Sequence, residues 1–201
     1  EIDTKYPTVT KFTVSDTSLQ AGDTAIVSLV FSESVANFNS DTDILFDTNN
    51  GILPTMTSSD QITWTSTFIP TTDLEFVGSN EFKLTTEYTD NAGNIGPAAT
   101  TSNFEIDTKY PTVTKFTVSD TSLQAGDTTV ISLVFSESVA NFSSDTDILF
   151  DTNNGNLPTM TSSNQITWVS TFTPTVNLEF EGTNEFKLTT NYTDNAGNIG
   201  P

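Results

Sequence analysis

The stretch Ile62-Thr-Trp-Thr-Ser-Thr-Phe68 decides the fold class of this chain. Its apolar or small side chains alternate with threonines, and this period of two is the pattern of a half-buried β-strand. Residues 26–31 and 81–88 alternate in the same way and are rich in Val, Phe and Thr, which favour strands. Turn sequences that contain Gly and Asn, such as residues 49–51 and 90–94, separate the segments. We therefore expect an all-β protein.

Seven expected strands in the first hundred residues suggest an immunoglobulin-like β-sandwich. The apolar parity breaks between Val9 and Phe12, which predicts a bulge or a change of sheet near Lys11. The strands are expected at residues 8–14, 24–32, 43–47, 52–57, 61–69, 81–88 and 98–106.

The chain is an internal repeat, because residues 1–97 and 105–201 differ at only 13 positions. Two copies this similar indicate a tandem array of modules of about 100 residues. We therefore expect two tandem immunoglobulin-like domains in an extended arrangement, residues 1–106 and 107–201. The sequence stops before a second copy of residues 98–104, so the second domain is expected to lack its C-terminal strand.

The composition excludes several functional classes. The chain has 26 acidic residues against 6 Lys and Arg and no His, a formal net charge of −20. Such a surface does not neutralise phosphates, so we expect no nucleic acid partner and no binding to anionic membranes. The absence of Cys and His removes disulfides, Cys-ligated zinc and the commonest general base. The sequence has no run of about 20 apolar residues and no signal-peptide pattern, so no membrane insertion is expected.

The alternating strand directions gather acidic residues at both ends of each sandwich. Crowded carboxylates repel one another unless a cation neutralises them. Calcium suits such loops, because it accepts about six to eight oxygen ligands in flexible geometry. The competing explanation for any one of these side chains is simple solvation at a strand end. We expect Ca²⁺ as the cofactor, with the candidate ligands Asp3, Glu33, Asp43, Asp90, Asp16, Asp73, Asp107, Glu137, Asp147 and Asp194.

The two copies limit which charges can be essential. Asp60 and Asp73 of the first repeat are replaced by Asn164 and Asn177 in the second. Neither position can therefore require a carboxylate in both repeats. The segment 47–51 partly resembles a calcium loop, but its Asn-Gly pair is equally typical of a hairpin turn.

Several motifs together resemble a known family. They are Leu29-Val-Phe-Ser-Glu-Ser-Val35, Phe38, Asp43, Thr67-Phe-Ile-Pro70 and Tyr88-Thr-Asp-Asn-Ala-Gly-Asn94. This combination resembles the bacterial immunoglobulin-like repeats of giant calcium-dependent surface adhesins, including the RTX adhesins. The resemblance implies a passive extender on the bacterial cell surface, stiffened by calcium and contacting only neighbouring repeats of its own chain. It assigns the ligand roles to Asp3, Glu33 and Asp90 in the first repeat and to Asp107, Glu137 and Asp194 in the second.

Two other classes of function stay open at this point. A calcium-dependent carbohydrate-binding module could stack a sugar on Trp64 or Trp168, but both lie on the inward parity of their strand, where core packing is the expected role. Pairs of carboxylates could serve a glycosidase. The short loops leave no room for a catalytic cleft, so we expect no enzyme and no small-molecule ligand.

Overall fold

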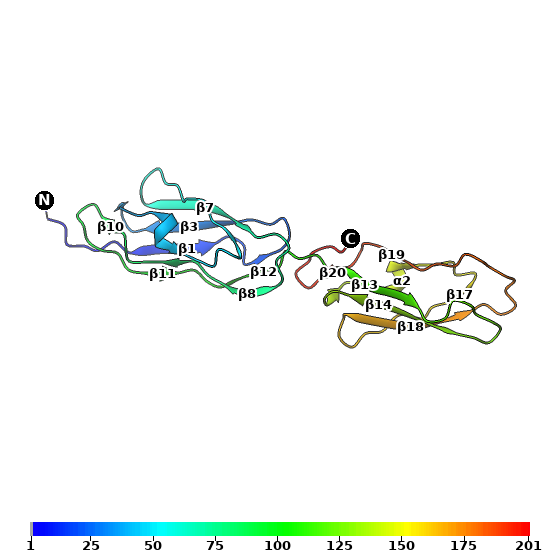
Figure 1. Cartoon of the computed structure of the whole chain (residues 1–201). Coiled ribbons are helices and arrows are strands. Elements are labelled where there is room, and N and C mark those ends of the chain that lie inside the picture. Colours follow the sequence, from blue (N-terminus) through cyan, green and yellow to red (C-terminus); the bar gives the residue numbers. More distant parts are fainter. Residues whose placement is uncertain (1) are drawn as a thin grey trace. The chain divides into compact units, whose positions relative to one another are not determined.

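The computed structural model describes residues 2–201 and divides them into two compact units. Unit 1 ends at Lys109, and unit 2 runs from Tyr110 to Pro201. Each unit is built from β-strands and a single four-residue helix, which confirms the all-β prediction (Figure 1). Within the described residues, no helix has the length and apolar character needed to cross a membrane.

Among the described residues of unit 1, β1, β3 and β7 have six to eight residues each, and the other strands have two to four. In chain order they are β1 (Val9–Val14), β2 (Ser18–Leu19), β3 (Ala25–Phe31), β4 (Val35–Ala36), α1 (Ser40–Asp43), β5 (Ile44–Leu45), β6 (Gly51–Ile52), β7 (Thr63–Pro70), β8 (Val77–Asn80), β9 (Lys83–Leu84), β10 (Thr89–Asp90), β11 (Ala99–Thr100) and β12 (Phe104–Ile106).

Unit 2 repeats most of this order. Its elements are β13 (Val113–Val118), β14 (Thr129–Phe135), β15 (Val139–Ala140), α2 (Ser144–Asp147), β16 (Ile148–Leu149), β17 (Gly155–Asn156), β18 (Thr167–Pro174), β19 (Lys187–Leu188) and β20 (Thr193–Asp194).

The main sheet of unit 1 has the antiparallel order β1-β3-β7-β6, and smaller sheets of order β11-β9-β5 and β2-β12-β8 supply further pairings. Figure 1 shows β1, β3 and β7 side by side, as their pairing requires. The register of β1 on β3 shifts between Val9 and Lys11, which confirms the bulge expected near Lys11. The bulge lets Val9 and Phe12 both face the core despite their odd spacing.

The core of unit 1 joins the main sheet to the later strands. On β3, Val27, Leu29 and Phe31 are buried, whereas the side chains between them are more exposed. The ring of Phe68 on β7 lies 5.3 Å from that of Phe82 and 5.7 Å from that of Phe104. These edge-to-face contacts are the favoured geometry of aromatic pairs, so the phenylalanines hold the layers together.

Two expected strands are shorter than the sequence suggested. The expected strand 43–47 begins only at Ile44, because Ser40–Asp43 forms helix α1, with the Asn39 side chain accepting a hydrogen bond from the Asp41 N–H. The expected strand 52–57 pairs at Gly51–Ile52 and meets β7 again only at Thr57. Pro54 lies between these points and has no N–H to donate to a ladder.

The expected strand 81–88 is also wrong as a single element. Lys83–Leu84 pairs with β5 and β11, whereas Thr89–Asp90 pairs with β4. Between them, the Thr85 N–H donates to the Asp43 carbonyl, and the Tyr88 side chain is fully buried. The chain therefore changes partners over this stretch, and the change places Asp90 beside β4.

Unit 2 has the same main sheet, in the order β13-β14-β18-β17. The sequence includes no second copy of residues 98–106, which form β11 and β12 in unit 1. Among the described residues, segments equivalent to β2 and β8 do not form strands in unit 2. This agrees with their role in unit 1, where β12 is the strand that pairs with both of them.

Candidate metal centre

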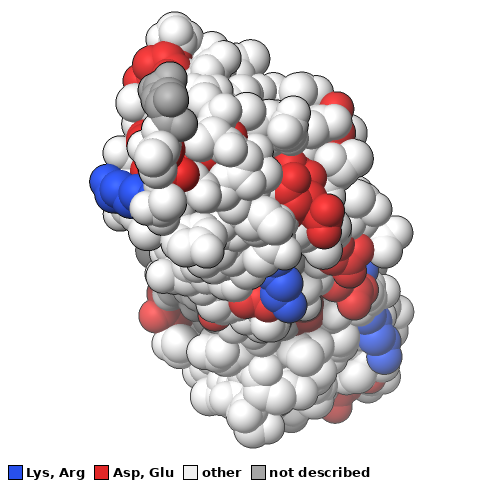
Figure 2. Space-filling view, turned by 90° about the vertical axis from the view of Figure 1, so that its left-hand side faces the viewer, with Lys and Arg blue, Asp and Glu red and all other residues white. Residues whose placement is uncertain are grey.

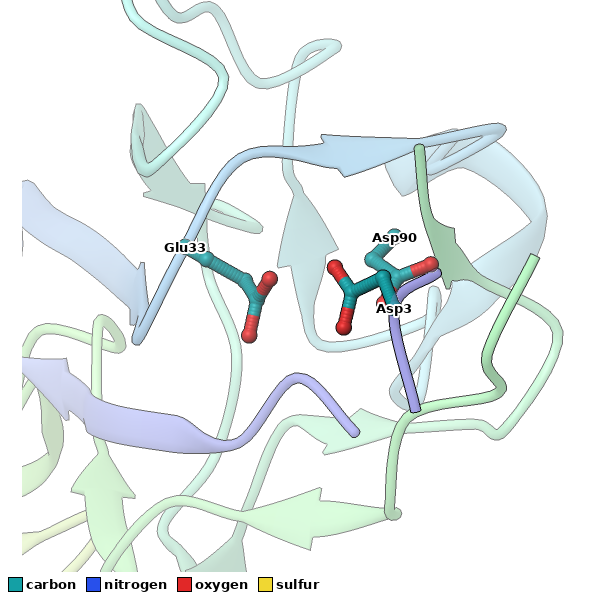
Figure 3. A group of neighbouring side chains, drawn as sticks. All are labelled: Asp3, Glu33 and Asp90. Atoms are coloured by element: carbon teal, nitrogen blue, oxygen red, sulfur yellow. The ribbon is translucent and has the colours of Figure 1, made fainter. Parts of the chain in front are cut away.

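Three carboxylates converge at the end of unit 1 that holds β4 and β10. One oxygen each from Asp3, Glu33 and Asp90 lies within 4.8 Å of the other two. Figure 3 shows the three carboxylates facing a common space, although they come from the start of the chain, from the segment after β3 and from β10. The structure thus brings together three residues that the sequence separates by up to 87 positions.

The most buried member of the group is Asp90, which is only 2% exposed. Its Oδ1 accepts hydrogen bonds from the N–H groups of Ala92 (2.8 Å) and Asn94 (2.9 Å). Its Oδ2 accepts one from the Asn94 side-chain amide at 2.7 Å. Since a carboxylate oxygen has two lone pairs, Oδ2 keeps one that can bind a cation.

The loop around Asp90 holds it in the ionised form. Gly93 has φ +92°, a conformation that favours glycine, and so the chain can turn tightly back toward the carboxylate. Hydrogen bonds, first of all from the Asn94 side chain, hold the pKa of Asp90 below its ordinary value, even though burial opposes this. Asp90 is therefore a fixed negative charge at neutral pH.

Glu33 supplies the least satisfied oxygen of the group. It follows the last residues of β3, and its Oε1 is buried without a hydrogen-bond partner. A buried carboxylate oxygen with no partner is costly, because it loses its hydration and gains nothing in return. Figure 3 shows this carboxylate directed toward Asp3 and Asp90.

Asp3 completes the group from an exposed position. Its Oδ1 accepts a hydrogen bond from the Lys5 N–H at 3.0 Å, and its carbonyl accepts one from the Asn94 side chain at 3.3 Å. No ion pair of the described residues involves the group. Within residues 2–201, no salt bridge therefore offsets the charge of the three carboxylates.

The second repeat carries the same three residue types at the equivalent positions, Asp107, Glu137 and Asp194. In unit 2, the Asp194 carboxylate accepts from the Asn198 N–H at 2.9 Å and from the Asn198 side chain at 2.7 Å, as Asp90 does from Asn94. Asp107 belongs to unit 1, where its N–H donates to the Leu19 carbonyl at 2.9 Å.

Two other expected ligands have local structural roles. Asp43 and Asp147 are 3% and 2% exposed and end the short helices α1 and α2. The Asp43 carboxylate accepts from the Asn39 N–H at 2.8 Å, and that of Asp147 accepts from the Ser143 N–H at 2.8 Å. Neither carboxylate belongs to the groups of three, and both complete the turn that begins each helix.

The remaining expected ligands, Asp16 and Asp73, also lie outside these groups. Asp16 accepts a hydrogen bond from the Ser18 N–H at 3.0 Å, which shapes the turn before β2. Asp73 has φ 58° and occupies the left-handed region that Asp and Asn tolerate best. Metal binding at these two residues stays a prediction.

The tryptophans face inward, as their parity predicted. Trp64 is partly buried and packs edge-to-face on Phe38, with ring centroids 4.9 Å apart. Trp168 and Phe142 repeat this pair at the same distance. These rings are engaged in the cores, so the arrangement does not favour a sugar-stacking platform.

Sequence reasoning gave no role to Asn94 and Asn198, whose side chains hold the two buried aspartates. The signal was present, because both end a copy of Asp-Asn-Ala-Gly-Asn.

Acidic side chains elsewhere are scattered, and Figure 2 shows them in several separate groups on the visible face, with few lysines between them. Crowding alone therefore does not distinguish the candidate site from solvated surface charge.

A comparison with protein families agrees with the repeat pattern. A family model described as a bacterial Ig-like domain matches residues 3–106 and again residues 107–201. Among solved structures, the chain is similar to FdeC, described as a broadly conserved Escherichia coli adhesin that elicits protection against urinary tract infections. That similarity has 10% identity and a TM-score of 0.48, and it covers 89% of this chain but 63% of that one, which is less than two thirds of its length. No curated protein matches the chain.

Proposed function

The chain belongs to the bacterial Ig-like domain family, as two tandem immunoglobulin-like domains, and on that premise we propose that it is a calcium-stabilised extender segment of a large bacterial cell-surface adhesin. Its partners in this role are the neighbouring repeats of the same chain, and its location is extracellular. The finer assignment to the RTX adhesins follows the motif resemblance of both repeats.

The observation that carries the calcium proposal is the buried, partnerless Oε1 of Glu33 beside two further carboxylates. A divalent cation would supply the missing partner and remove the repulsion within the group. The oxygen-only donor set fits calcium, which binds carboxylates and carbonyls in variable geometry. It fits zinc poorly, since the chain has no Cys or His. Bound calcium would supply charge neutralisation, and the residues would supply a fixed geometry.

The extender role is supported by the close duplication of the two domains. A rod needs many equivalent modules, whereas a ligand-binding tip gains nothing from a nearly identical neighbour. The two repeats keep all three residue types of the candidate site, although they differ at surface positions such as Glu87 and Asn191. The alternative role as a carbohydrate-binding module has no comparable support, because Trp64 and Trp168 are packed against core phenylalanines.

Calcium titration of the full chain tests this proposal. We expect calcium to raise the melting temperature relative to EDTA, since a ligand that binds only the folded state stabilises it by about 2.7 kcal/mol at one hundred times its Kd. Magnesium should substitute poorly, because it requires near-octahedral geometry and retains its waters. Glu33→Gln should weaken calcium binding at the first site by at least about tenfold, as a charged ligand is lost.

Asp60→Asn is the matched control for this variant. It also removes one negative charge, and Asn164 shows that Asn in this position accepts the same backbone hydrogen bonds, at 3.0 Å from Ile166 and 2.9 Å from Thr167. Calcium affinity should be unchanged in Asp60→Asn. Superimposable melting curves in EDTA and in millimolar calcium would refute the calcium proposal.

A further inference from the structure

The three residues Asp107, Thr108 and Lys109 belong to the second domain by sequence but to the first unit by their contacts. The family match assigns them to the second domain, which begins at residue 107. The contacts assign them to unit 1, which ends at Lys109. The segment that opens the second repeat is therefore held by the first unit, Asp107 through Leu19 of β2 and the next two residues through the loop 71–75.

Thr108 is the centre of this attachment, and it is 4% exposed. Its hydroxyl donates to the Thr71 carbonyl at 2.6 Å and accepts from the Leu74 N–H at 3.0 Å. The Leu74 carbonyl in turn accepts from the N–H groups of Thr108 (3.0 Å) and Lys109 (3.1 Å). The Lys109 ammonium forms a salt bridge with Glu75. The loop thus bonds the backbone and side chains of Thr108 and Lys109, whereas the Asp107 N–H donates to the Leu19 carbonyl of β2.

The first part of this loop has the same shape in both units. In unit 1, Thr71 anchors it by donating from its N–H to the Asn50 carbonyl and from its hydroxyl to the Asn49 carbonyl, at 3.0 and 2.8 Å. In unit 2, Thr175 makes the same two bonds at the same distances. The turn residue has φ 58° in unit 1 and 59° in unit 2. Since unit 2 has the same two bonds and the same turn with no Asp-Thr-Lys segment bound among its described residues, this first part of the loop does not depend on such a segment.

The first repeat provides the contrast. Thr4 and Lys5 are the sequence equivalents of Thr108 and Lys109, and both are exposed in unit 1. The same tripeptide is therefore buried where a preceding loop receives it and exposed where the described residues include no such loop. The burial of Thr108 reflects its receptor rather than its own sequence.

We propose that the loop 71–75 is a metal-independent receptor for Thr108 and Lys109, and that Thr108 is a positioning residue which, together with the bond from the Asp107 N–H to Leu19, fixes Asp107 to unit 1. The part of this proposal that concerns calcium rests on the proposed function, whereas the attachment itself does not. By removing freedom from the backbone of Asp107, the receptor lowers the entropic cost of recruiting that carboxylate as a ligand.

Amide hydrogen exchange of the full chain in EDTA tests the attachment without any metal. The amides of Thr108 and Lys109 should exchange at least about tenfold more slowly than those of Thr4 and Lys5, because only the first pair is hydrogen-bonded to a receptor loop. Thr108→Ala should remove most of this protection, whereas Thr108→Ser, which keeps the hydroxyl, should retain it. Equal exchange of the two wild-type pairs would overturn the proposal, whatever calcium does.

Calcium titration then tests the positioning role. In a Glu33→Gln background, which weakens the first group, Thr108→Ala should weaken the calcium binding that depends on Asp107 by about 5- to 30-fold, the cost of ordering one residue. Thr108→Ser and the matched control Thr4→Ala should leave the affinity unchanged, and melting of unit 1 reports any general loss of stability. An unchanged affinity in Thr108→Ala would overturn the positioning role. If the Thr108 and Lys109 amides are protected in EDTA but the chain binds no calcium, the calcium proposal is wrong and the attachment to the loop is still supported.

Discussion

The two units have nearly the same sequence but differ in how completely their cores are covered. In unit 1, Leu19, Phe82 and Leu84 are at most 2% exposed, and Phe104 stacks on Phe82 with ring centroids 5.4 Å apart. In unit 2, the equivalents Leu123, Phe186 and Leu188 are only partly buried. The difference indicates what the segment 98–106 contributes, because the described unit 2 has no counterpart of this segment or of the three residues that follow it in unit 1.

The largest effect should come from giving unit 2 that segment. A chain extended after Pro201 by the sequence of residues 98–106 should gain the burial of one Phe and one Ile, worth about 3–6 kcal/mol. The melting temperature of unit 2 should then rise by more than about 10 °C, as expected for a domain of this size. Calorimetry measures both transitions. An extension with Ser at the two apolar positions is the control, and an equal gain from that extension would contradict the packing argument.

The converse change should make unit 1 resemble unit 2. Phe104 is 2% exposed and contacts both Phe68 and Phe82. Phe104→Ala should therefore cost unit 1 about 3–5 kcal/mol. Denaturant unfolding followed by tryptophan fluorescence would measure the loss, and the unit 2 transition should not move. A loss below about 1 kcal/mol would show that the segment adds little to the core of unit 1.

Sequence patterns predicted the parts of this fold that depend on alternation. The long strands β3 and β7 follow directly from alternating side chains, and the bulge near Lys11 follows from a broken parity. The pattern did not predict β2 or β8, since these two-to-four-residue strands exist only because β12 pairs with them. Pairings between remote residues leave no local signal in a single sequence.

The candidate site was predictable in its residues but not in its chemistry. Topology and motif resemblance together singled out Asp3, Glu33 and Asp90, and the structure brings these three together. The same reasoning also pointed to Asp43, whose carboxylate is occupied by the Asn39 N–H at a helix start. Asp43 and Asp90 look alike in sequence, and both carboxylates accept hydrogen bonds in the structure. What separates them is position, because only Asp90 lies within 4.8 Å of two other carboxylates. Metal binding at either residue stays a prediction.

Alkaline pH should affect unit 1 through a buried tyrosine. Burial raises the pKa of Tyr88 to about 12, and its hydroxyl donates to the Pro97 carbonyl at 2.8 Å. Because the fold disfavours the ionised form, the stability from this group is fully present below about pH 10 and is lost as pH rises toward 12. The melting temperature of unit 1 should fall over that window, whereas Tyr88→Phe should show a smaller fall from a lower starting point. Identical pH profiles for the two proteins would contradict this account.

Tyr192 is the equivalent of Tyr88 in unit 2, so the two tyrosines allow the units to be compared. Burial also raises its pKa, but its hydroxyl lies 3.5 Å from the Pro201 carbonyl, so its hydrogen bond is weaker. Tyr192→Phe should therefore cost unit 2 less at neutral pH than Tyr88→Phe costs unit 1, where about 1 kcal/mol is expected for the lost bond. Thermal unfolding at pH 7 measures both variants. A larger cost in unit 2 would reverse the order that these distances imply.

The smallest effect should be at Asp73, because the equivalent position of the second repeat already carries an asparagine, Asn177. Asn177 has φ 59°, within one degree of Asp73, so the loop requires a residue that tolerates the left-handed region rather than a charge. Asp73→Asn should therefore change the stability of unit 1 by less than about 0.5 kcal/mol. Asp73→Val, whose branched side chain is strained at positive φ, should cost about 1–3 kcal/mol. Denaturant midpoints compare the two variants directly. If Asp73→Asn also lowered calcium affinity while stability stayed constant, then Asp73 would be a ligand after all, and the turn geometry would be only part of its role.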